Sequence, residues 1–262
     1  MPVALTIAGS DPTGGAGLQA DLKTFAALGV YGASVVTAIT AQSTQGVVDT
    51  FPLPADVVSA QFDALGGDIT VDATKTGMLG NDAIVESVAA MIVSLDLPRV
   101  VVDPVLAATS GGALLAPDAI STLKHELLRH AFVVTPNVPE AEILSGLPIR
   151  TIDDVKKAAE RIHRLGPRAV IIKGGHLAGP HAIDLLFDGE QMIEFPAPRL
   201  PGPPAHGTGC AFSAALAAGL ALGRPLPEAT EQAKHYVTGA LRHRLTIGRG
   251  APLLDHFWER YT

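Results

Sequence analysis

The residues best suited to chemistry follow short apolar runs along the chain. The polar or glycine-rich segments found in these places are 9–17, 40–42, 75–78, 103–105, 135–140 and 173–176. In open α/β sheets, ligands bind outside the carboxyl ends of the strands. We therefore expect these segments to form one rim, where Asp103, Glu140 and Lys173 would supply charge.

The strongest single segment is 206–215, where a glycine-rich turn enters an alanine-rich helix. Free N–H groups at a helix start and the positive end of its dipole stabilise negative charge. Gly207, Thr208 and Gly209 are therefore predicted to bind an anion. The thiol of Cys210, at the same helix start, is expected to have a lowered pKa and to act as proton acceptor or nucleophile. A small buried cysteine is the alternative.

The first glycine-rich loop matches neither of two familiar nucleotide-binding motifs. Gly9 and Gly14 have P-loop spacing, but Gly15 and Ala16 stand where a lysine and a serine or threonine are required. Residues 15–20 fit a dinucleotide loop, yet they lie well past the strand, and the next strand offers no acid for a ribose. A P-loop is excluded and a nicotinamide site is disfavoured, which leaves a flexible turn before a helix as the alternative.

Three further positions have competing explanations. Asp103 either holds a metal ion or water, or begins a turn with Pro104. Asn137 is better explained as a helix cap, with Pro139 tolerated in the first turn. Lys173 abuts an apolar strand and needs an anionic partner or ligand.

The elements that must position these residues alternate along the chain. Brief β-rich runs are predicted as buried strands at 3–8, 34–39, 100–102, 132–134 and 169–172. Segments with helical spacing lie between them, such as Leu18, Leu22, Phe25 and Leu28. This alternation predicts a largely parallel sheet with helices on both faces, in a single domain spanning residues 1–262.

A hairpin and a stiff loop are predicted after the fifth strand. Residues 185–187 and 192–195 flank Asp188-Gly189, a tight-turn dipeptide. The segment 195–204 contains five prolines in ten residues and is predicted to be a loop.

Charge and cysteine usage narrow the partners and the compartment. The 262 residues include 26 acidic and 19 basic side chains, a formal charge of -7, which argues against a nucleic-acid or anionic-membrane surface. The longest charge-free run, 24–48, contains glutamines, glycines and hydroxyls, so no membrane span is expected. The single cysteine and an N-terminus without a basic region favour a reducing cytoplasm.

Together these segments resemble a known enzyme family over nearly the whole chain and in order. The matching motifs are 9–17, 20–25, 40–44, 75–79, 103–105, 135–142, 173–176 and 206–210. They are similar to the hydroxymethylpyrimidine/phosphomethylpyrimidine kinases of thiamine biosynthesis, and Gln42 with Cys210 favours this family over its relatives. The resemblance implies a ribokinase-like three-layer α/β/α sandwich with a mostly parallel central sheet.

The resemblance also implies an activity and a substrate pocket. The activity is ATP- and Mg²⁺-dependent phosphorylation of 4-amino-5-hydroxymethyl-2-methylpyrimidine, and then of its monophosphate. Four residues would bound the pyrimidine: Gly9, Asp21, Gln42 and Met78. A carboxamide suits this task because its donor and acceptor can pair with a ring nitrogen and the adjacent amino group.

The remaining implied roles concern phosphate. Asp103 and Glu140 would hold Mg²⁺, Lys173 would compensate phosphoryl charge, and Cys210 would accept the proton of the substrate hydroxyl. The second phosphorylation attacks through an ionised phosphate oxygen and needs no base. The residues implied for ATP binding are Asp103, Asn137, Lys173, Gly207, Thr208 and Gly209.

Two segments depart from the family pattern, and other functions stay open. Residues 201–205 are richer in proline than is usual, and 248–252 only partly match a Gly/His-rich stretch. A pyridoxal kinase of the same superfamily is the nearest alternative, although Gln42 disfavours it. A cysteine hydrolase using Cys210 with His206 and a non-catalytic pyrimidine-binding protein are the alternatives from other classes. A homodimer is expected.

Overall fold

The structure is a computed structural model that describes residues 1–106 and 115–260. Within these residues, nine strands form one sheet in the order β3-β2-β1-β4-β5-β6-β7-β8-β9. The strands are β1 (Val3–Ser10), β2 (Tyr31–Ser43), β3 (Gly46–Pro52), β4 (Ala73–Thr76), β5 (Val100–Val102), β6 (Val133–Val134), β7 (Val170–Ile172), β8 (His181–Phe187) and β9 (Met192–Pro198). Strands β2 to β7 along this order are parallel, whereas β3, β8 and β9 pair antiparallel at the two edges.

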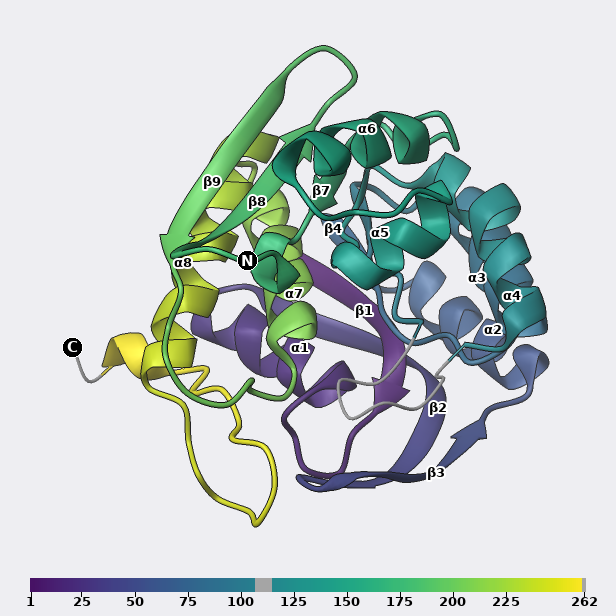
Figure 1. Cartoon of the computed structure of the whole chain (residues 1–262). Coiled ribbons are helices and arrows are strands. Elements are labelled where there is room, and N and C mark those ends of the chain that lie inside the picture. Colours follow the sequence, from purple (N-terminus) through teal and green to yellow (C-terminus); the bar gives the residue numbers. More distant parts are fainter. Residues whose placement is uncertain (107–114, 261–262) are drawn as a thin grey trace.

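Helices cover both faces of the sheet (Figure 1). They are α1 (Gly17–Ala27), α2 (Ala55–Gly66), α3 (Asp82–Ser94), α4 (Pro117–Thr122), α5 (Val138–Ser145), α6 (Ile152–His163), α7 (Thr208–Ala221) and α8 (Leu226–Arg242), with short π or 3₁₀ turns at Leu123–Leu127, Leu128–His130, Gly174–His176 and Trp258–Arg260. Helices α1, α7 and α8 share one buried apolar cluster, and α2, α3, α5 and α6 share the other. The sheet is therefore the middle layer, and the helices packed on its two faces are the outer layers of the predicted three-layer sandwich.

The chain order places a topological switch point between β1 and β4. From β1 the chain moves outward to β2 and β3, and then returns to β4 on the other side of β1. Connections therefore leave the carboxyl ends of β1 and β4 in opposite directions, which opens a crevice at that edge. The glycine-rich loop after β1 and the start of α7 meet there, because a Cβ on Gly207 would lie 1.7 Å from the Gly15 carbonyl oxygen.

The helix α7 owes its central place to its composition. Every residue from Ala211 to Ala221 is buried, so this helix is apolar on all sides. Small side chains let it pack closely against both α1 and α8. Its start is thereby held rigidly at the rim of the sheet.

Two expectations about strands are wrong at the first half of the sheet. The second strand runs on to Ser43, so residues 40–42 do not form a loop after a strand. They belong to the part of β2 that pairs antiparallel with β3, and their polar sequence gives no sign of this pairing. Residues 73–76 form the buried strand β4, so Lys75 lies inside the sheet and only Gly77 and Met78 follow it. Short or polar strands carry too weak a period-two pattern to be recognised.

The predicted hairpin is confirmed, but the proline-rich loop begins later than expected. Strand β9 continues to Pro198, with Pro196 opposite Ile183 and Pro198 opposite His181. Because β9 is an edge strand, a proline whose backbone nitrogen faces the open side removes no hydrogen bond from the sheet. The loop prediction therefore holds only beyond Pro198. In the described residues, no helix combines the length and apolarity that crossing a membrane requires.

Candidate active site

The charged centre of the rim is an ion pair between Asp103 and Lys173. Lys173 Nζ lies 2.9 Å from Asp103 Oδ1, which satisfies the predicted need of that lysine for an anionic partner. Ser213 Oγ donates to Asp103 Oδ2 at 3.0 Å, and Thr135 Oγ1 donates more weakly to Oδ1 at 3.4 Å. Although burial opposes it, attraction to Asp103 and Glu140 raises the pKa of Lys173, so this amine is a permanent cation.

The start of α7 lies directly over this pair. A Cβ on Gly209 would be 3.2 Å from Lys173 Nζ and 3.8 Å from Asp103 Oδ2. The N-cap of the helix is Gly207, whose φ of 81° is in the left-handed region, and no side chain caps the helix there. An uncapped helix start and an ammonium group therefore lie side by side, and both features favour a bound anion.

Asn137 and Glu140 close a capping box at the start of α5. The Asn137 side chain accepts from the Glu140 N–H at 3.0 Å, and Glu140 Oε2 accepts from the Asn137 N–H at 2.8 Å. The predicted capping role of Asn137 is confirmed. Burial raises the pKa of Glu140 to about 7, helped by the nearby Asp103 carboxylate and opposed by Lys173.

Cys210 lies at the α7 start, but its thiol does not have the expected acidity. Desolvation raises its pKa to about 11, although Lys75 and a hydrogen bond from the Gly17 N–H act in the opposite direction. The prediction of a lowered pKa is therefore wrong. A helix dipole acts within the first turn, and here the loss of water outweighs it.

Asp21 and Lys75 form a second ion pair beneath the crevice. Lys75 Nζ lies 2.7 Å from Asp21 Oδ2, which also accepts from Thr6 Oγ1 at 2.6 Å. Both charged residues are completely buried. The structure therefore places Asp21 against Lys75 and away from the open surface, and its direct contact with a pyrimidine stays a prediction.

Gln42 lines an open pocket of about 370 Å³ at the other end of the crevice. The pocket is walled by residues 42–46, 204, 206 and 249–251. Gln42 Nε2 lies 2.8 Å from His206 Nε2, which in turn lies 2.9 Å from Asp11 Oδ2. Gly9 and Met78 are neighbours, since a Cβ on Gly9 would lie 3.3 Å from the Met78 sulfur.

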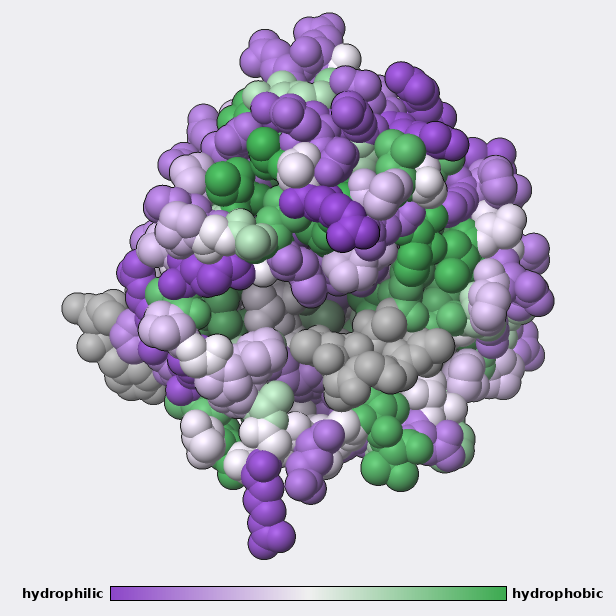
Figure 2. All heavy atoms as spheres, in the orientation of Figure 1, coloured by the Kyte–Doolittle hydropathy of each residue, from purple (hydrophilic) through white to green (hydrophobic). Residues whose placement is uncertain are grey.

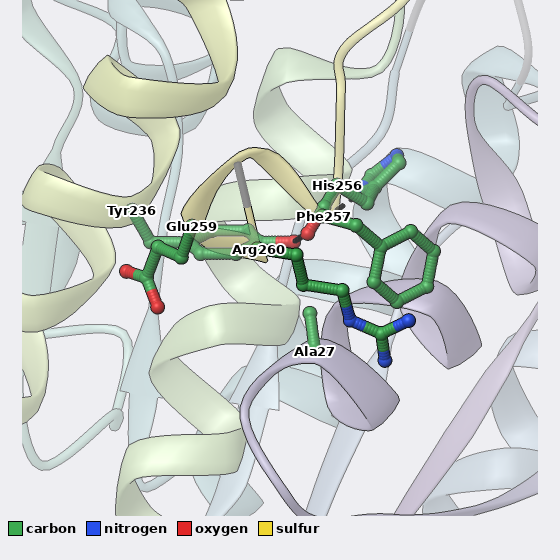
Figure 3. A pocket seen from close by; sticks show the side chains of 6 residues that line it. All are labelled: Ala27, Tyr236, His256, Phe257, Glu259 and Arg260. Atoms are coloured by element: carbon green, nitrogen blue, oxygen red, sulfur yellow. Dashed lines mark hydrogen bonds between the residues drawn. The ribbon is translucent and has the colours of Figure 1, made fainter. Parts of the chain in front are cut away.

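A second, much smaller cavity of about 20 Å³ lies between α1, α8 and the C-terminal segment (Figure 3). His256 Nδ1 there contacts Thr24 Oγ1 at 3.1 Å, and the Tyr236 hydroxyl donates to the His256 carbonyl at 2.9 Å. Burial lowers the pKa of His256 to about 4, so its ring is neutral. Figure 3 shows the Arg260 guanidinium beside the Phe257 ring, 4.5 Å from its centre. These contacts hold the segment 256–260 against α1 and α8.

Sequence reasoning missed three polar residues that the fold brings to the site. The sequence marks Asp11 and Lys75 only as members of polar segments, and Ser213 lies within an alanine-rich helix. A hydroxyl on a helix that is otherwise apolar on all sides is the one signal that could have identified Ser213, because a buried hydroxyl needs a partner. The long-range partners of Asp11 and Lys75 are His206 and Asp21, which lie 195 and 54 positions away, so no local pattern reveals these pairs.

The fold and the site are those of an α/β enzyme with an open pocket and a lysine–aspartate pair near the carboxyl edge of its sheet. The family model described as phosphomethylpyrimidine kinase matches residues 11–255. The chain belongs to this family, and the expectation drawn from its motifs is confirmed.

Similar proteins agree in length and fold. The chain is 51% identical over 258 residues to the hydroxymethylpyrimidine/phosphomethylpyrimidine kinase of Rhizobium meliloti, covering 97% of each chain. The phosphomethylpyrimidine kinase of Clostridium difficile has a TM-score of 0.83 at 41% identity, over 92% of this chain and 100% of that one. The ADP complex of Bacillus subtilis pyridoxal kinase has a TM-score of 0.93 at 39% identity, over 100% of each. The predicted ribokinase-like fold is therefore confirmed.

Proposed function

We propose that this protein uses ATP to phosphorylate 4-amino-5-hydroxymethyl-2-methylpyrimidine and then its monophosphate, within a single kinase domain spanning residues 1–262. The observation that carries the proposal is that one short segment, residues 206–210, contacts both the pocket and the Asp103–Lys173 pair. His206 lies against Gln42 in the pocket, and three residues later Gly209 lies against Lys173. A ring held at Gln42 would therefore direct its hydroxymethyl group toward the anion site.

Each phosphoryl transfer needs its developing charge stabilised more than it needs covalent chemistry. Lys173 supplies a fixed positive charge, and the N–H groups at the start of α7 supply oriented dipoles. Asp103 keeps Lys173 in place while Ser213 and Thr135 hold Asp103. This preorganised set serves both the alcohol and the monophosphate.

Deprotonation of the substrate alcohol is assigned to Cys210. It lies at the same helix start and is the only ionisable thiol of the chain. Because its pKa is about 11, only a small fraction is thiolate at neutral pH, and the first phosphorylation should become faster as the pH rises. The monophosphate is already ionised and needs no such acceptor.

Two carboxylates near the phosphate site fit a hard divalent cation such as Mg²⁺. Asp103 raises the pKa of Glu140, so the two like charges repel when both are ionised, and a cation between them would relieve this repulsion. In the parts of the chain that the structure describes, no cluster of three or more metal-ligating side chains occurs. Mg²⁺ sites in kinases commonly take only one or two carboxylates and complete their shell with waters and phosphates. Asp103 and Glu140 would hold the ion, which would neutralise phosphate charge.

ATP is the proposed phosphoryl donor. The structurally similar pyridoxal kinase of Staphylococcus aureus has been solved with AMP-PCP and pyridoxal, at a TM-score of 0.91 and 37% identity. Asn137, Lys173 and the glycines at the α7 start are the residues proposed to contact the nucleotide. Pyridoxal stays a second candidate substrate, because the pyridoxal kinase of Bacillus subtilis matches the fold at a TM-score of 0.93.

A coupled assay with ATP tests this function. It compares the hydroxymethylpyrimidine, its monophosphate and pyridoxal on one preparation of the purified protein. We expect both pyrimidines to be phosphorylated with a higher kcat/KM than pyridoxal. A higher kcat/KM for pyridoxal would reassign the enzyme to the alternative.

The role of Gln42 is tested with Gln42→Leu, which keeps the approximate size of the side chain and removes both hydrogen-bonding groups. Leaving buried edge groups of the ring unpaired costs roughly 1 to 3 kcal/mol, so affinity should fall from about fivefold to over a hundredfold. Calorimetric titration of the pyrimidine into the folded variant measures this. Unchanged affinity would remove Gln42 from the ring pocket.

A homodimer and a cytoplasmic location complete the proposal. Ile39, Val48 and Phe51 on β2 and the edge strand β3 are 52%, 82% and 54% exposed, and such exposed apolar side chains favour burial against a second copy. Hydrophobic residues reach the surface at the lower edge of the molecule in Figure 2, where Figure 1 places β3. Light scattering of the purified protein measures the mass. The lone thiol of Cys210 suits a reducing compartment.

A further inference from the structure

Two hydrogen-bonding contacts converge on one nitrogen in the pocket. His206 Nε2 lies 2.9 Å from Asp11 Oδ2 and 2.8 Å from Gln42 Nε2. A ring nitrogen either carries a proton and donates or lacks one and accepts. A carboxylate can only accept and an amide NH₂ can only donate. The contact with Asp11 therefore requires a proton on this nitrogen, whereas the contact with Gln42 Nε2 requires that it carry none.

Asp11 decides the conflict because its carboxylate is firmly ionised. Its Oδ1 accepts from the Thr13 N–H at 2.9 Å, and its Oδ2 accepts from the Thr13 hydroxyl and the Ala16 N–H, both at 2.8 Å. Although burial opposes them, hydrogen bonds from His206 and Thr13 lower the pKa of Asp11. A carboxylate surrounded by donors requires a proton on the facing ring nitrogen. His206 Nε2 therefore carries the hydrogen.

This proton dictates the orientation of the Gln42 amide. A half-turn about its last bond exchanges the amide oxygen and nitrogen and brings the oxygen to His206 Nε2–H. The nitrogen then takes the place of Oε1, 3.3 Å from Thr40 Oγ1. Thr40 Oγ1 already donates to the Ser10 carbonyl at 2.9 Å, so its lone pairs are free to accept. The Nε2–H is then shared between the Asp11 carboxylate and the Gln42 oxygen, so neither contact of this nitrogen sets two donors or two acceptors against each other.

We propose that Asp11 and His206 are positioning residues that lock the Gln42 carboxamide in this orientation, so that the pocket selects a ring with an amino group beside a ring nitrogen and rejects the corresponding oxo ring. With its oxygen on the His206 side and its N–H on the Thr40 side, the amide accepts from an amino group and donates to the ring nitrogen. A 4-oxo ring presents the reverse pattern. To bind the oxo ring, the Gln42 amide would have to make a second half-turn, which would place its NH₂ group against His206 Nε2–H, two donors facing each other. The inference rests on the proposed function, because it assumes that Gln42 contacts the ring.

The first experiment measures substrate discrimination. We compare kcat/KM for the 4-amino pyrimidine and its 4-oxo analogue in wild type, His206→Phe and Asp11→Asn. One mispaired edge is worth roughly 1 to 3 kcal/mol, so wild type should favour the amino ring by about fivefold to over a hundredfold. In both variants the amide is free to turn, and the ratio should fall to within about threefold of unity. A role in folding alone would lower both rates and leave the ratio unchanged.

Two controls make the outcome decisive. His181→Phe makes the same change at an exposed hairpin position and should keep the wild-type ratio. The second control reports on wild type directly: ¹⁵N NMR of the labelled protein, with His206 assigned by the signal that is lost in His206→Phe, shows which ring nitrogen is protonated. A proton on Nε2 supports the proposal, whereas a ring protonated only on Nδ1 overturns it.

The two tests also separate this proposal from the proposed function. If wild type phosphorylates neither ring, the kinase assignment fails, while the NMR measurement still decides the state of His206. If wild type phosphorylates the amino ring and both variants keep its full preference over the oxo ring, the kinase stands and the positioning role is wrong.

Discussion

Two lysine–aspartate pairs lie near the carboxyl ends of strands in the same sheet, and they differ in exposure and in the hydrogen bonds to their carboxylates. Asp21–Lys75 spans 2.7 Å with both side chains 0% exposed, whereas Asp103–Lys173 spans 2.9 Å with the side chains 3% and 13% exposed. The first pair is enclosed under α1 and α7. The second meets the crevice at the start of α7.

The hydrogen bonds around the two carboxylates explain what each pair can do. Asp103 has Ser213 and Thr135 besides its lysine, so it stays satisfied if Lys173 turns toward a phosphate. Asp21 has only Thr6 besides its lysine, and in the described structure its Oδ1 has no hydrogen-bond partner. If Lys75 turned away, the Asp21 carboxylate would remain buried without a counter-charge. The enclosed pair holds the crevice together, and the accessible pair can act on ligands.

The largest expected effect is on the enclosed pair. Lys75→Met leaves the Asp21 carboxylate buried and unpaired, and breaking a buried pair in this way typically costs about 3 to 5 kcal/mol of folding stability. Chemical denaturation followed by circular dichroism measures the change in the free energy of unfolding.

The matched control removes both charges at once. Asp21→Leu with Lys75→Met should restore most of the stability, because a well-packed apolar pair often replaces a buried ion pair without loss. A double variant as unstable as Lys75→Met would show that the lysine acts through something other than Asp21. Pyrimidine titration of the same double variant also tests the predicted contact of Asp21 with the ring.

Lys173→Met tests the accessible pair with the same substitution. Loss of this cation should lower kcat for both phosphorylations by about 10² to 10³, because the transferring charge is common to them. The loss of stability should be smaller than for Lys75→Met, since Asp103 keeps two hydroxyl donors. Turnover within about threefold of wild type, less than 1 kcal/mol in the barrier, would contradict the assigned role.

Cys210 interacts electrostatically with charged residues of both pairs. The pH dependence of the rate should differ between the two phosphorylations if this thiol is the proton acceptor. The thiol pKa of about 11 means that thiolate grows tenfold per pH unit below that value. If the thiolate accepts the proton, kcat/KM for the alcohol should rise about tenfold per unit between roughly pH 7 and 9, while the monophosphate reaction stays flat.

Cys210→Ala should remove that slope and slow the alcohol reaction far more than the monophosphate reaction. Both rates are measured on one preparation, so partial unfolding cancels. A flat wild-type profile for the alcohol, or equal losses in the two reactions, would leave Cys210 as a packing residue at the helix start.

The smallest expected effect comes from Ser213→Ala. It removes one of three donors to Asp103, and the remaining Lys173 and Thr135 limit the cost to about 1 kcal/mol, or roughly fivefold in turnover. Steady-state kinetics on both substrates measure it. A loss as large as that of Lys173→Met would mean that the hydroxyl, rather than the ion pair, organises the site.

The sequence by itself determined the elements whose signals are local. Apolar periodicity predicts α1, the Asp188-Gly189 dipeptide predicts the hairpin, and Asn137 predicts a helix start. Ordered motifs along the chain determined the family as well, because each motif is contiguous. These inferences hold because a cap, a turn or an amphipathic face depends on residues within a few positions of one another.

Only the tertiary structure decided which charges meet and which side chains lose water. Lys75 pairs with a residue 54 positions away, and Lys173 with one 70 positions away. The thiol of Cys210 lies at a helix start, which lowers a pKa, and Lys75 and the Gly17 N–H lower it further, yet burial among the packed elements outweighs them and raises it. Desolvation depends on every element packed around a group, and it is strong enough to reverse a local effect.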